Sequence, residues 1–244
     1  MSKNKIPVLE IFGPTIQGEG MVVGQKTMFV RTAGCDYSCS WCDSAFTWDG
    51  SAKNDIKRMD PSEIVERLIE IGGKNFTHVT ISGGNPALLS QLDLLIDLLH
   101  QNDLQVAVET QGTKYQEWFL KIDQLTISPK PPSSNMETNY EKLDIIIEKL
   151  IKKNRLLSTS LKVVIFNQED LQYATMIHER YPTVPFYLQV GNPIIIEEDR
   201  ELLVSKLLVK YEWLINEVLS NPKLNNAKVL PQLHTLVWGN KRGV

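Results

Sequence analysis

Short apolar runs rich in β-branched and aromatic residues alternate with longer runs of helical periodicity along this chain of 244 residues. Such alternation is typical of βα units, which build a largely parallel sheet covered by helices. We expect strands at 8–12, 27–31, 78–81, 105–108, 124–127, 161–166 and 186–189. We expect helices from residue 60 onward and at 87–100, 140–152, 171–181 and 198–219. The pattern predicts an α/β fold. The sequence has no internal repeat, low-complexity tract or long linker, so we expect one domain over 1–244.

The start of the first helix carries a capping signal. Asp60 is a preferred N-cap residue, Pro61 suits the first helical position, and the Glu63 side chain can accept a hydrogen bond from the N–H of the cap residue. Apolar residues then recur at helical spacing, beginning with Ile64 and Leu68. This combination predicts where the helix begins.

Polar and glycine-containing segments follow several expected strands at the point where each strand ends. In parallel sheets and barrels, the carboxyl ends of the strands form the ligand-binding edge. We therefore expect these segments to share one rim, together with the last part of the chain. They are 31–35, 82–86, 109–112 and 128–130, joined by Gln189 and by 232–234.

Cys35, Cys39 and Cys42 are the only cysteines in the chain. An odd number cannot be satisfied by internal disulfides, and the polar segment around them lacks the periodicity of buried packing residues. Three thiolates on one loop would leave one iron of an iron-sulfur cluster open to a small molecule. The alternative is a structural zinc site with a distant histidine as fourth ligand. The histidines available are His78, His100, His178 and His234.

Composition limits the class of protein. Hydrophobic residues make up 42% and charged residues 23%, as in ordinary globular proteins. A chain of this length does not need a metal merely to fold, so an inorganic centre would be functional. The chain has no long apolar run, and 1–7 lacks a signal-peptide core, so we expect a cytoplasmic protein whose thiols stay reduced. A net charge of −3 favours a small-molecule substrate over nucleic acid or an anionic membrane.

The cysteine spacing after an early strand, followed by 83–86 (Gly-Gly-Asn-Pro) after a later one, resembles the radical S-adenosylmethionine superfamily. The resemblance implies a partial (β/α) TIM-like barrel, the radical S-adenosylmethionine core, whose open side is covered by loops and the carboxyl-terminal segment. It implies that Cys35, Cys39 and Cys42 hold a 4Fe-4S cluster, and that S-adenosylmethionine chelates the open iron. One electron then cleaves the cofactor and releases a 5′-deoxyadenosyl radical that abstracts hydrogen.

The same resemblance assigns residues to S-adenosylmethionine. Backbone at Gly84 would hold the methionine amino group, but the superfamily usually has Glu where Asn85 stands. Asn can accept a hydrogen bond without adding a negative charge, so Glu109 is a candidate to supply the carboxylate. Without the resemblance, the glycines would indicate only close backbone approach, and Glu109 and Lys130 would be solvated charges. The expected cofactor-binding residues are Trp41, Asp43, Gly84, Asn85, Glu109, Ser128, Pro129 and Lys130.

Longer segments resemble the 7-carboxy-7-deazaguanine synthase family. They are 11–20, 29–35, 41–44, 127–130 and 230–234, and the likeness runs from about residue 8 to residue 239. It implies conversion of 6-carboxy-5,6,7,8-tetrahydropterin to 7-carboxy-7-deazaguanine with loss of ammonia, a carbon-nitrogen lyase reaction in queuosine biosynthesis. S-adenosylmethionine would be regenerated in each turnover. Queuosine is a transfer-RNA component, but the enzyme itself would not contact nucleic acid.

Substrate and metal residues follow from this resemblance. Gln17 and Glu19 would hydrogen-bond the pterin ring, and the planar fork of Arg31 suits a carboxylate. The expected substrate-binding set is Ile16, Gln17, Gly18, Glu19, Arg31, Ser82 and His234. The family has Thr two residues after the last cluster cysteine, where Ser44 keeps an oxygen ligand for Mg²⁺ and Asp43 could assist. The resemblance also implies a homodimer and a reductant such as flavodoxin or ferredoxin.

Two alternatives stay open on the sequence. A glycyl-radical-enzyme activase shares the cysteine spacing, but it would need a protein partner and would lack the segments around Gln17 and His234. A non-catalytic, zinc-stabilised binding module would be colourless and contain zinc, whereas a cluster protein is brown and oxygen-sensitive. The helix expected around 202–219 could serve packing or dimer formation.

Overall fold

The computed structural model describes residues 4–194 and 199–244, and one nine-stranded sheet runs through them. Its strand order is β3-β1-β2-β4-β5-β6-β7-β8-β9. Strand β1 pairs antiparallel with β2 and β3, whereas every neighbouring pair from β2 to β9 is parallel. The strands are β1 (Ile6–Ile16), β2 (Lys26–Thr32), β3 (Lys57–Met59), β4 (His78–Gly83), β5 (Gln105–Thr110), β6 (Gln124–Ile127), β7 (Thr159–Ile165), β8 (Phe186–Val190) and β9 (Ala227–Leu230).

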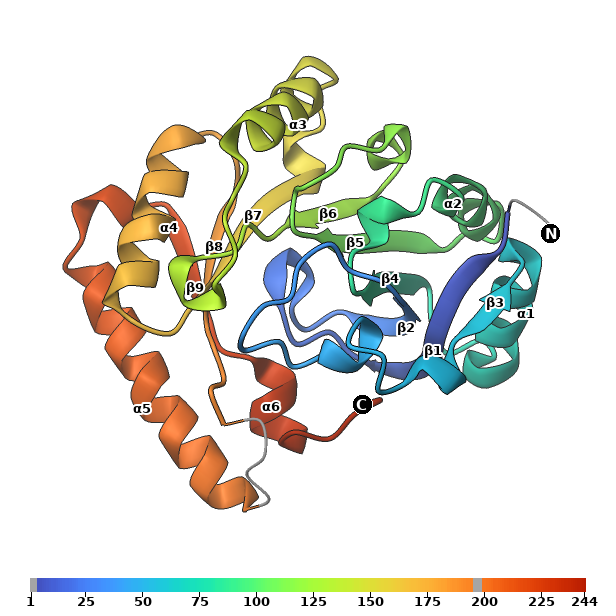
Figure 1. Ribbon diagram of the computed structural model, residues 1–244, viewed down its shortest axis with the longest axis horizontal. Helices are drawn as coiled ribbons and strands as arrows, with labels where there is room; N and C mark the ends of the chain where they lie inside the picture. Colours follow the sequence, from blue (N-terminus) through green and yellow to red (C-terminus); the bar gives the residue numbers. More distant parts are fainter. Residues whose placement is uncertain (1–3, 195–198) are drawn as a thin grey trace.

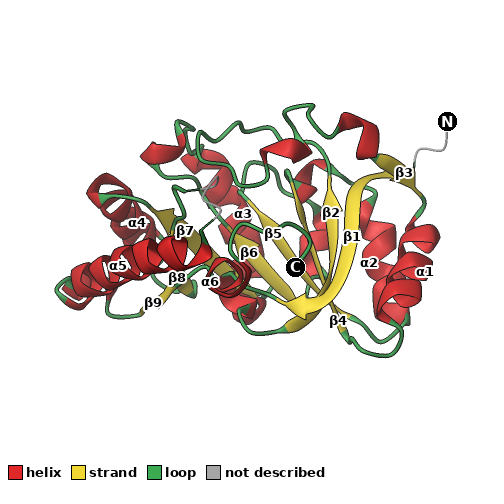
Figure 2. Ribbon diagram, turned by 90° about the horizontal axis from the view of Figure 1, so that it is seen from below, coloured by secondary structure: helices red, strands yellow, loops and turns green. Residues whose placement is uncertain are grey.

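The strands form an open arc rather than a closed barrel, with helices packed on its outer side (Figure 1). The helices are α1 (Pro61–Gly72), α2 (Leu92–Gln101), α3 (Tyr140–Lys152), α4 (Gln168–Arg180), α5 (Arg200–Leu219) and α6 (Leu233–Trp238). Figure 2 shows α6 and the carboxyl terminus over the open side of the arc, between β9 and β1. The expected partial (β/α) barrel with mostly parallel strands is therefore confirmed.

The two faces of the parallel strands differ in chemistry, because successive side chains point to opposite sides of a strand. One set packs beneath the helices in the apolar core: Val79, Ile81, Val106, Val108, Leu161, Val163, Phe186 and Leu188. The alternating set is polar yet buried: Thr80, Thr126, Ser160, Lys162 and Gln189. This second set faces the inside of the arc, where apolar residues such as Phe29 and Val164 also line the cavity, so the barrel interior combines polar and apolar groups.

Most expected elements are present, and the differences have local causes. The capping signal at the first helix is confirmed, since Asp60 N donates a 2.6 Å hydrogen bond to the Glu63 carboxylate. The helix expected at 87–100 is divided into a short turn at Pro86–Leu88 and α2, because Leu89 adopts an extended conformation. Helix α4 begins before residue 171 because the Asn167 side chain caps it. The expected start of the last long helix, residue 198, lies outside the described residues.

Strand β1 is longer than the expected 8–12, because register shifts let it follow the curvature of β2 along its whole length. Strands β3 and β9 and helix α6 are short elements that the sequence pattern did not predict as such. Among the described helices, none is both long enough and apolar enough to cross a membrane.

Candidate active site

A cavity of about 310 Å³ opens at the carboxyl ends of the parallel strands, inside the arc. Most of the expected shared rim is present, since residues after β2, β4, β5 and β6 and from the last part of the chain line this cavity, whereas Gln189 is not among its lining residues. Sixteen of the residues expected to bind a cluster, cofactor, substrate or metal line it: Ile16, Gln17, Gly18, Glu19, Arg31, Cys35, Cys39, Trp41, Cys42, Asp43, Ser44, Ser82, Gly84, Glu109, Lys130 and His234. Asn85, Ser128 and Pro129 are not among its lining residues.

The segment that carries Cys35, Cys39 and Cys42, called the cysteine loop below, follows β2 and is held by the segment after β6. Ser40 N donates to the carbonyl of Ser134 at 3.0 Å, and Ser40 Oγ donates to the carbonyl of Ser133 at 2.7 Å. Ser133 is in turn fixed by the Asp170 carboxylate of α4, which accepts from its backbone and its hydroxyl. The loop has little regular structure of its own, so these contacts fix its position.

The three half-buried thiols share one side of the cavity. Cys35 Sγ accepts hydrogen bonds from Gln111 Nε2 at 3.3 Å and Tyr37 N at 3.4 Å, and Cys42 Sγ accepts one from Trp48 Nε1 at 3.5 Å. Burial raises the pKa of Cys35, and it raises that of Cys39 to about 11, with the neighbouring thiols adding to both shifts. Three clustered sulfurs with N–H donors directed at them fit the ligand set of an iron-sulfur cluster.

The Gly83-Gly84 pair allows the end of β4 to lie directly against the cysteine loop. Gly83 has φ +131°, and a Cβ there would overlap the carbonyl of Thr32; a Cβ at Gly84 would overlap the carbonyl of Gly34. Asn85 N donates to the same Gly34 carbonyl at 2.8 Å. The glycines are therefore required for close backbone approach, whatever else Gly84 contacts.

Asn85 is fully buried and its amide is engaged within the protein. Its Nδ2 donates to Asp36 Oδ1 at 2.8 Å and to Thr113 Oγ1 at 2.9 Å, while its Oδ1 accepts from Thr110 Oγ1 at 2.7 Å. Asp36 also accepts from Gln111 at 2.7 Å. The side chain thus anchors the residue next to Cys35, and direct contact with the cofactor stays a prediction.

Trp41 and Lys130 lie on the side of the cavity nearest the segment after β6. The Trp41 ring packs 4.8 Å from the Phe166 ring, and Lys130 Nζ lies 5.9 Å from the Trp41 ring centre. Lys130 Nζ also donates to Ser128 Oγ at 3.2 Å. Ser128 is buried and therefore acts here as support for Lys130.

The turn after β1 brings Gln17 and Glu19 to the lining of the cavity. Gln17 Oε1 accepts from Gly18 N at 2.7 Å and from Glu19 N at 3.2 Å, so this side chain stabilises its own turn. Gly18 O accepts from Leu233 N at 3.1 Å, and Gln232 Nε2 donates to Glu19 Oε1 at 3.0 Å. The two ends of the chain therefore meet at the substrate-binding residues that the sequence predicted.

Lys162 is the main residue that the sequence interpretation missed. Its Nζ lies 2.6 Å from Glu19 Oε2 and 2.5 Å from Glu109 Oε1, and the side chain is 1% exposed. Burial alone would raise the pKa of Glu19, but the charges of Lys162 and His234 and hydrogen bonds from Lys162 and Gln232 hold it far below its usual value. The available signal was a lysine inside the otherwise apolar run 161–166, where an unpaired charge is rare.

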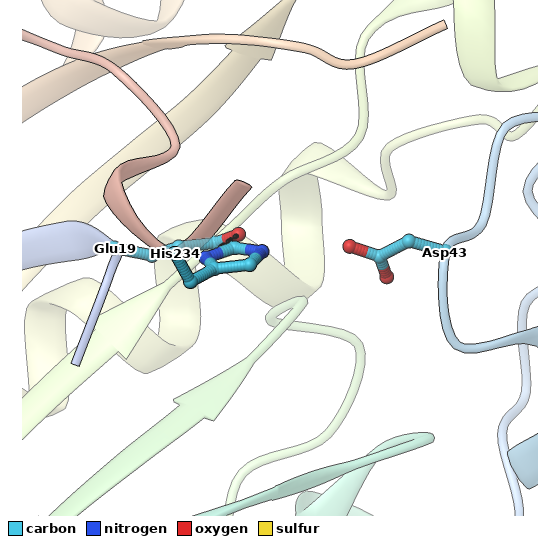
Figure 3. Close-up of side chains that lie close together, drawn as sticks. All are labelled: Glu19, Asp43 and His234. Carbon is cyan, nitrogen blue, oxygen red and sulfur yellow. Dashed lines mark ion pairs between the residues drawn. The ribbon is translucent and has the colours of Figure 1, made fainter. Parts of the chain in front are cut away.

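Glu19, Asp43 and His234 approach one another within the cavity, and one candidate ligand atom from each lies within 4.8 Å of the others. Figure 3 shows the Asp43 carboxylate directed toward the His234 ring from the other side. Both Glu19 oxygens already accept hydrogen bonds from protein donors. Ser44, which follows Asp43, also lines the cavity, and its Oγ lies 3.7 Å from Cys42 Sγ.

Arg31 is oriented by an ion pair and by aromatic rings. Its Nε lies 2.6 Å from Glu10 Oε1, and its guanidinium lies 5.5 Å from the ring centres of Phe12 and Phe46. Arg242 lies 3.9 Å from the Phe46 ring and donates to Glu10 Oε2 at 2.9 Å. These contacts bring the last residues of the chain to the cavity and give it a cationic side.

Ser82 Oγ is buried at the edge of the cavity and has no hydrogen-bond partner among the described residues. A buried hydroxyl without a partner is costly. Its position makes it available to a bound molecule.

A family model described as the Radical SAM superfamily matches residues 29–166, which include the cysteine loop, β4 and β5. QueE from Escherichia coli has a similar solved structure: the likeness covers 94% of this chain and 95% of that chain, with a TM-score of 0.60 and 21% sequence identity. At that identity the likeness bears on the fold alone. The fold, the thiols and the family model together define a radical S-adenosylmethionine enzyme, which uses a 4Fe-4S cluster and S-adenosylmethionine and acts on a small molecule.

Two curated relatives narrow the assignment. The 7-carboxy-7-deazaguanine synthase of Bacillus subtilis is 66% identical over 98% of this chain and 98% of its own length. That of Bacillus cereus is 63% identical over 99% of this chain and 100% of its own length. The chain belongs to the 7-carboxy-7-deazaguanine synthase family.

Proposed function

We propose that this protein converts 6-carboxy-5,6,7,8-tetrahydropterin to 7-carboxy-7-deazaguanine with loss of ammonia, in the biosynthesis of the 7-deazapurine of queuosine. The observation that carries the proposal is one cavity lined both by the three clustered thiols and by Glu19 and His234. Asp43, next to Cys42, directs its carboxylate toward the His234 ring in the same cavity (Figure 3). The names of the Bacillus relatives support the same reaction. We propose that residues 1–244 act as a single radical S-adenosylmethionine domain.

Cys35, Cys39 and Cys42 would hold the cluster, and their common position on one side of the cavity supports this role. When bound, the cluster and S-adenosylmethionine supply the radical chemistry that removes a hydrogen atom from the substrate. We assign Trp41, Asp43, Gly84, Glu109 and Lys130 to cofactor binding because they line the cavity. Asn85, Ser128 and Pro129 would support these residues from behind the lining.

Substrate binding is assigned to a second group of lining residues, which includes Glu19 and His234. Glu19 would accept hydrogen bonds from N–H groups of the pterin ring, and His234 beside it would add a further polar contact. Arg31, oriented by Glu10, suits the substrate carboxylate, and the unpartnered Ser82 hydroxyl suits a polar substrate atom. Ile16, Gln17 and Gly18 would shape the turn that presents Glu19.

A magnesium ion would bind at Ser44, with Asp43 nearby, because Mg²⁺ prefers oxygen ligands and retains several waters. The electron would come from a reductant such as flavodoxin or ferredoxin, and we propose a homodimer as the assembly. We place the enzyme in the reducing cytoplasm, where thiolates remain available to iron.

The direct test is anaerobic incubation of the cluster-reconstituted protein with the carboxytetrahydropterin, S-adenosylmethionine, Mg²⁺ and a reductant, followed by mass detection of 7-carboxy-7-deazaguanine. Product formation by the wild type, and its loss in Cys39→Ala, is the expected result. Formation of 5′-deoxyadenosine alone would leave the radical class standing and remove the substrate assignment. An active Cys39→Ala variant would contradict the radical mechanism.

A further inference from the structure

Lys162 lies on the inner side of the arc. It belongs to β7, between Leu161 and Val163 of the apolar core, and its own side chain turns to the opposite face and lines the cavity. Its ammonium group bridges Glu19, which comes from the turn after β1, and Glu109, which comes from β5. One cation thus connects three parts of the chain at the base of the candidate substrate site.

The charge balance at this point depends on Lys162. Two carboxylates and one ammonium leave one net negative charge in a buried site. Without the ammonium, two buried carboxylates would face each other with nothing to neutralise either, and such a pair shares a proton rather than remaining doubly ionised. Within residues 4–194 and 199–244, the other titratable groups that face Glu19 are His234 from α6 and Asp43 from the cysteine loop.

The geometry also fixes the direction of the Glu19 carboxylate. Lys162 holds Oε2 at 2.6 Å and Gln232 holds Oε1 at 3.0 Å. The backbone of the turn is held as well, since Gly20 N donates to Gln189 Oε1 at 3.4 Å. A carboxylate oxygen has two lone pairs, so each one retains a free acceptor site beside the cavity. Two such sites side by side match the adjacent N–H donors of an aminopyrimidinone ring edge.

We propose that Lys162 is a positioning residue that keeps Glu19 ionised and oriented to accept the N–H edge of the substrate's pterin ring. This inference rests on the proposed function, because it concerns the same substrate. Lys162 acts through Glu19 and has no part in forming the radical. Its loss should therefore weaken substrate binding and leave cluster assembly and S-adenosylmethionine binding intact.

Replacing Lys162 by Met keeps the length of the side chain and removes its charge. The measured quantity is the dissociation constant of the carboxytetrahydropterin, determined anaerobically on cluster-loaded protein with S-adenosylmethionine and no reductant. The matched control is Lys228→Met on β9, because Lys162, Tyr187 and Lys228 occupy the same level of the sheet and Lys228 does not line the cavity. We expect Lys162→Met to bind the pterin at least about tenfold more weakly at neutral pH, and Lys228→Met to bind like wild type.

The pH dependence separates positioning from a merely structural role. Without the ammonium, burial raises the pKa of Glu19 with no Lys162 charge to offset it, and a protonated Glu19 cannot accept two N–H donors. Affinity in Lys162→Met should therefore fall as the pH is lowered from about 8 to about 6, whereas wild type and Lys228→Met should show no such Glu19-dependent loss. In the double variant Lys162→Met/Glu109→Gln, the cluster of residues 19, 109 and 162 keeps its net charge of −1. This variant should therefore lose affinity for the pterin at a lower pH than Lys162→Met does.

The outcomes are distinguishable. If wild type carries the cluster and binds S-adenosylmethionine but does not bind the pterin, the proposed function falls. If wild type binds the pterin and Lys162→Met shows the same constant and the same pH profile, the positioning role falls and the proposed function stands. If Lys162→Met does not fold, the test uses the double variant Lys162→Met/Glu109→Gln, which should bind the pterin more weakly than wild type. A dissociation constant equal to that of wild type in this double variant would overturn the inference.

Discussion

Gly18 lies directly against His234: a Cβ at Gly18 would stand 2.7 Å from the backbone nitrogen of His234 and would also meet its ring. The carbonyl of Gly18 accepts a hydrogen bond from Leu233 N at 3.1 Å. The turn after β1 and the start of α6 are therefore in backbone contact across the open side of the arc. This contact is possible because residue 18 has no side chain.

Gly18→Ala should displace α6 and with it His234. Because a tightly packed site relaxes only partly, we expect a loss of about 1–3 kcal/mol in the free energy of unfolding. We also expect a drop of at least about tenfold in kcat/KM for the pterin, since Gln232 and His234 would leave Glu19. Denaturant unfolding and anaerobic turnover would measure the two effects, and the cluster absorbance should remain.

Gly50→Ala is the matched control for this substitution. Gly50 has φ +88° and no atom within 4 Å of an added Cβ, so the variant carries backbone strain without displacing a neighbour. It should lose some stability and keep its kcat/KM. Wild-type kcat/KM in Gly18→Ala would show that the contact with α6 does not position the site.

Asn85→Leu removes the buried amide while keeping a similar volume. Asp36, Thr110 and Thr113 would each lose one hydrogen bond, and a broken buried network of this kind costs about 2–4 kcal/mol. Because Asp36 precedes the rest of the cysteine loop, reconstituted variant protein should also hold less iron per chain. Denaturant unfolding and an iron assay give the two values.

Asn102→Leu provides the comparison for Asn85. The amide of Asn102 also donates a hydrogen bond, to the carbonyl of Leu98 at 2.8 Å, but at an exposed helix end. Its loss should cost well under half as much stability and leave the iron content unchanged. Equal effects of the two substitutions would contradict an anchoring role for Asn85.

The elements and the rim could be predicted because they depend on local patterns. The apolar run of β7 and the helical spacing after Asp60 can each be recognised from the local sequence alone. Because ligands bind at the carboxyl ends of parallel strands, Arg31, Ser82 and Glu109 could then be placed on one edge of the sheet. The cysteine spacing marks the cluster loop without any knowledge of register. These inferences need only the direction of the strands.

Other features depend on contacts between distant parts of the chain. The role of Lys162 follows from which residues of β5 and the turn after β1 lie beside β7, and no local pattern gives that register. The Asn85 amide points into the protein because Asp36 and Thr113, which are distant in the sequence, accept its hydrogen bonds. Arg242 reaches Glu10 from the far end of the chain. Such pairings become visible only when the arc is assembled.

The pKa of Cys39 predicts how the metal-free protein reacts with alkylating reagents. Burial raises this pKa to about 11, the Lys130 charge lowers it, and the charges of Cys42 and Cys35 raise it. The thiolate is the reactive form, so Cys39 in the folded, metal-free protein should react at pH 8 about a hundredfold more slowly than in the unfolded chain. Its alkylation rate, followed by peptide mass spectrometry, should still be rising at about pH 10.

The same shift has a consequence for stability. A thiol whose pKa is higher in the folded than in the unfolded chain contributes stability below the unfolded value of about 8.5, and this is lost as the pH rises toward about 11. Metal-free protein should therefore unfold more easily over that alkaline range.

Lys130→Met should slow the alkylation of Cys39 further, because it removes the charge that lowers the pKa of this thiol. Equal alkylation rates for folded and unfolded chains at pH 8 would contradict the burial of this thiol.

Ser44 gives a test of the proposed magnesium site. Its hydroxyl lies on the cavity lining beside Asp43, and an ion held by one protein hydroxyl, substrate and water should depend strongly on that oxygen. Ser44→Ala should raise the Mg²⁺ concentration for half-maximal turnover at least about tenfold, whereas Ser44→Thr, which keeps the hydroxyl, should respond like wild type. Chelation by EDTA should lower the activity of wild type and Ser44→Thr, and added Mg²⁺ should restore it.

Ser51→Ala is the control variant. It removes a hydroxyl that donates a hydrogen bond to Asp49 in an exposed turn, and it should leave the Mg²⁺ response unchanged. A wild-type Mg²⁺ response in Ser44→Ala would place the ion elsewhere in the cavity.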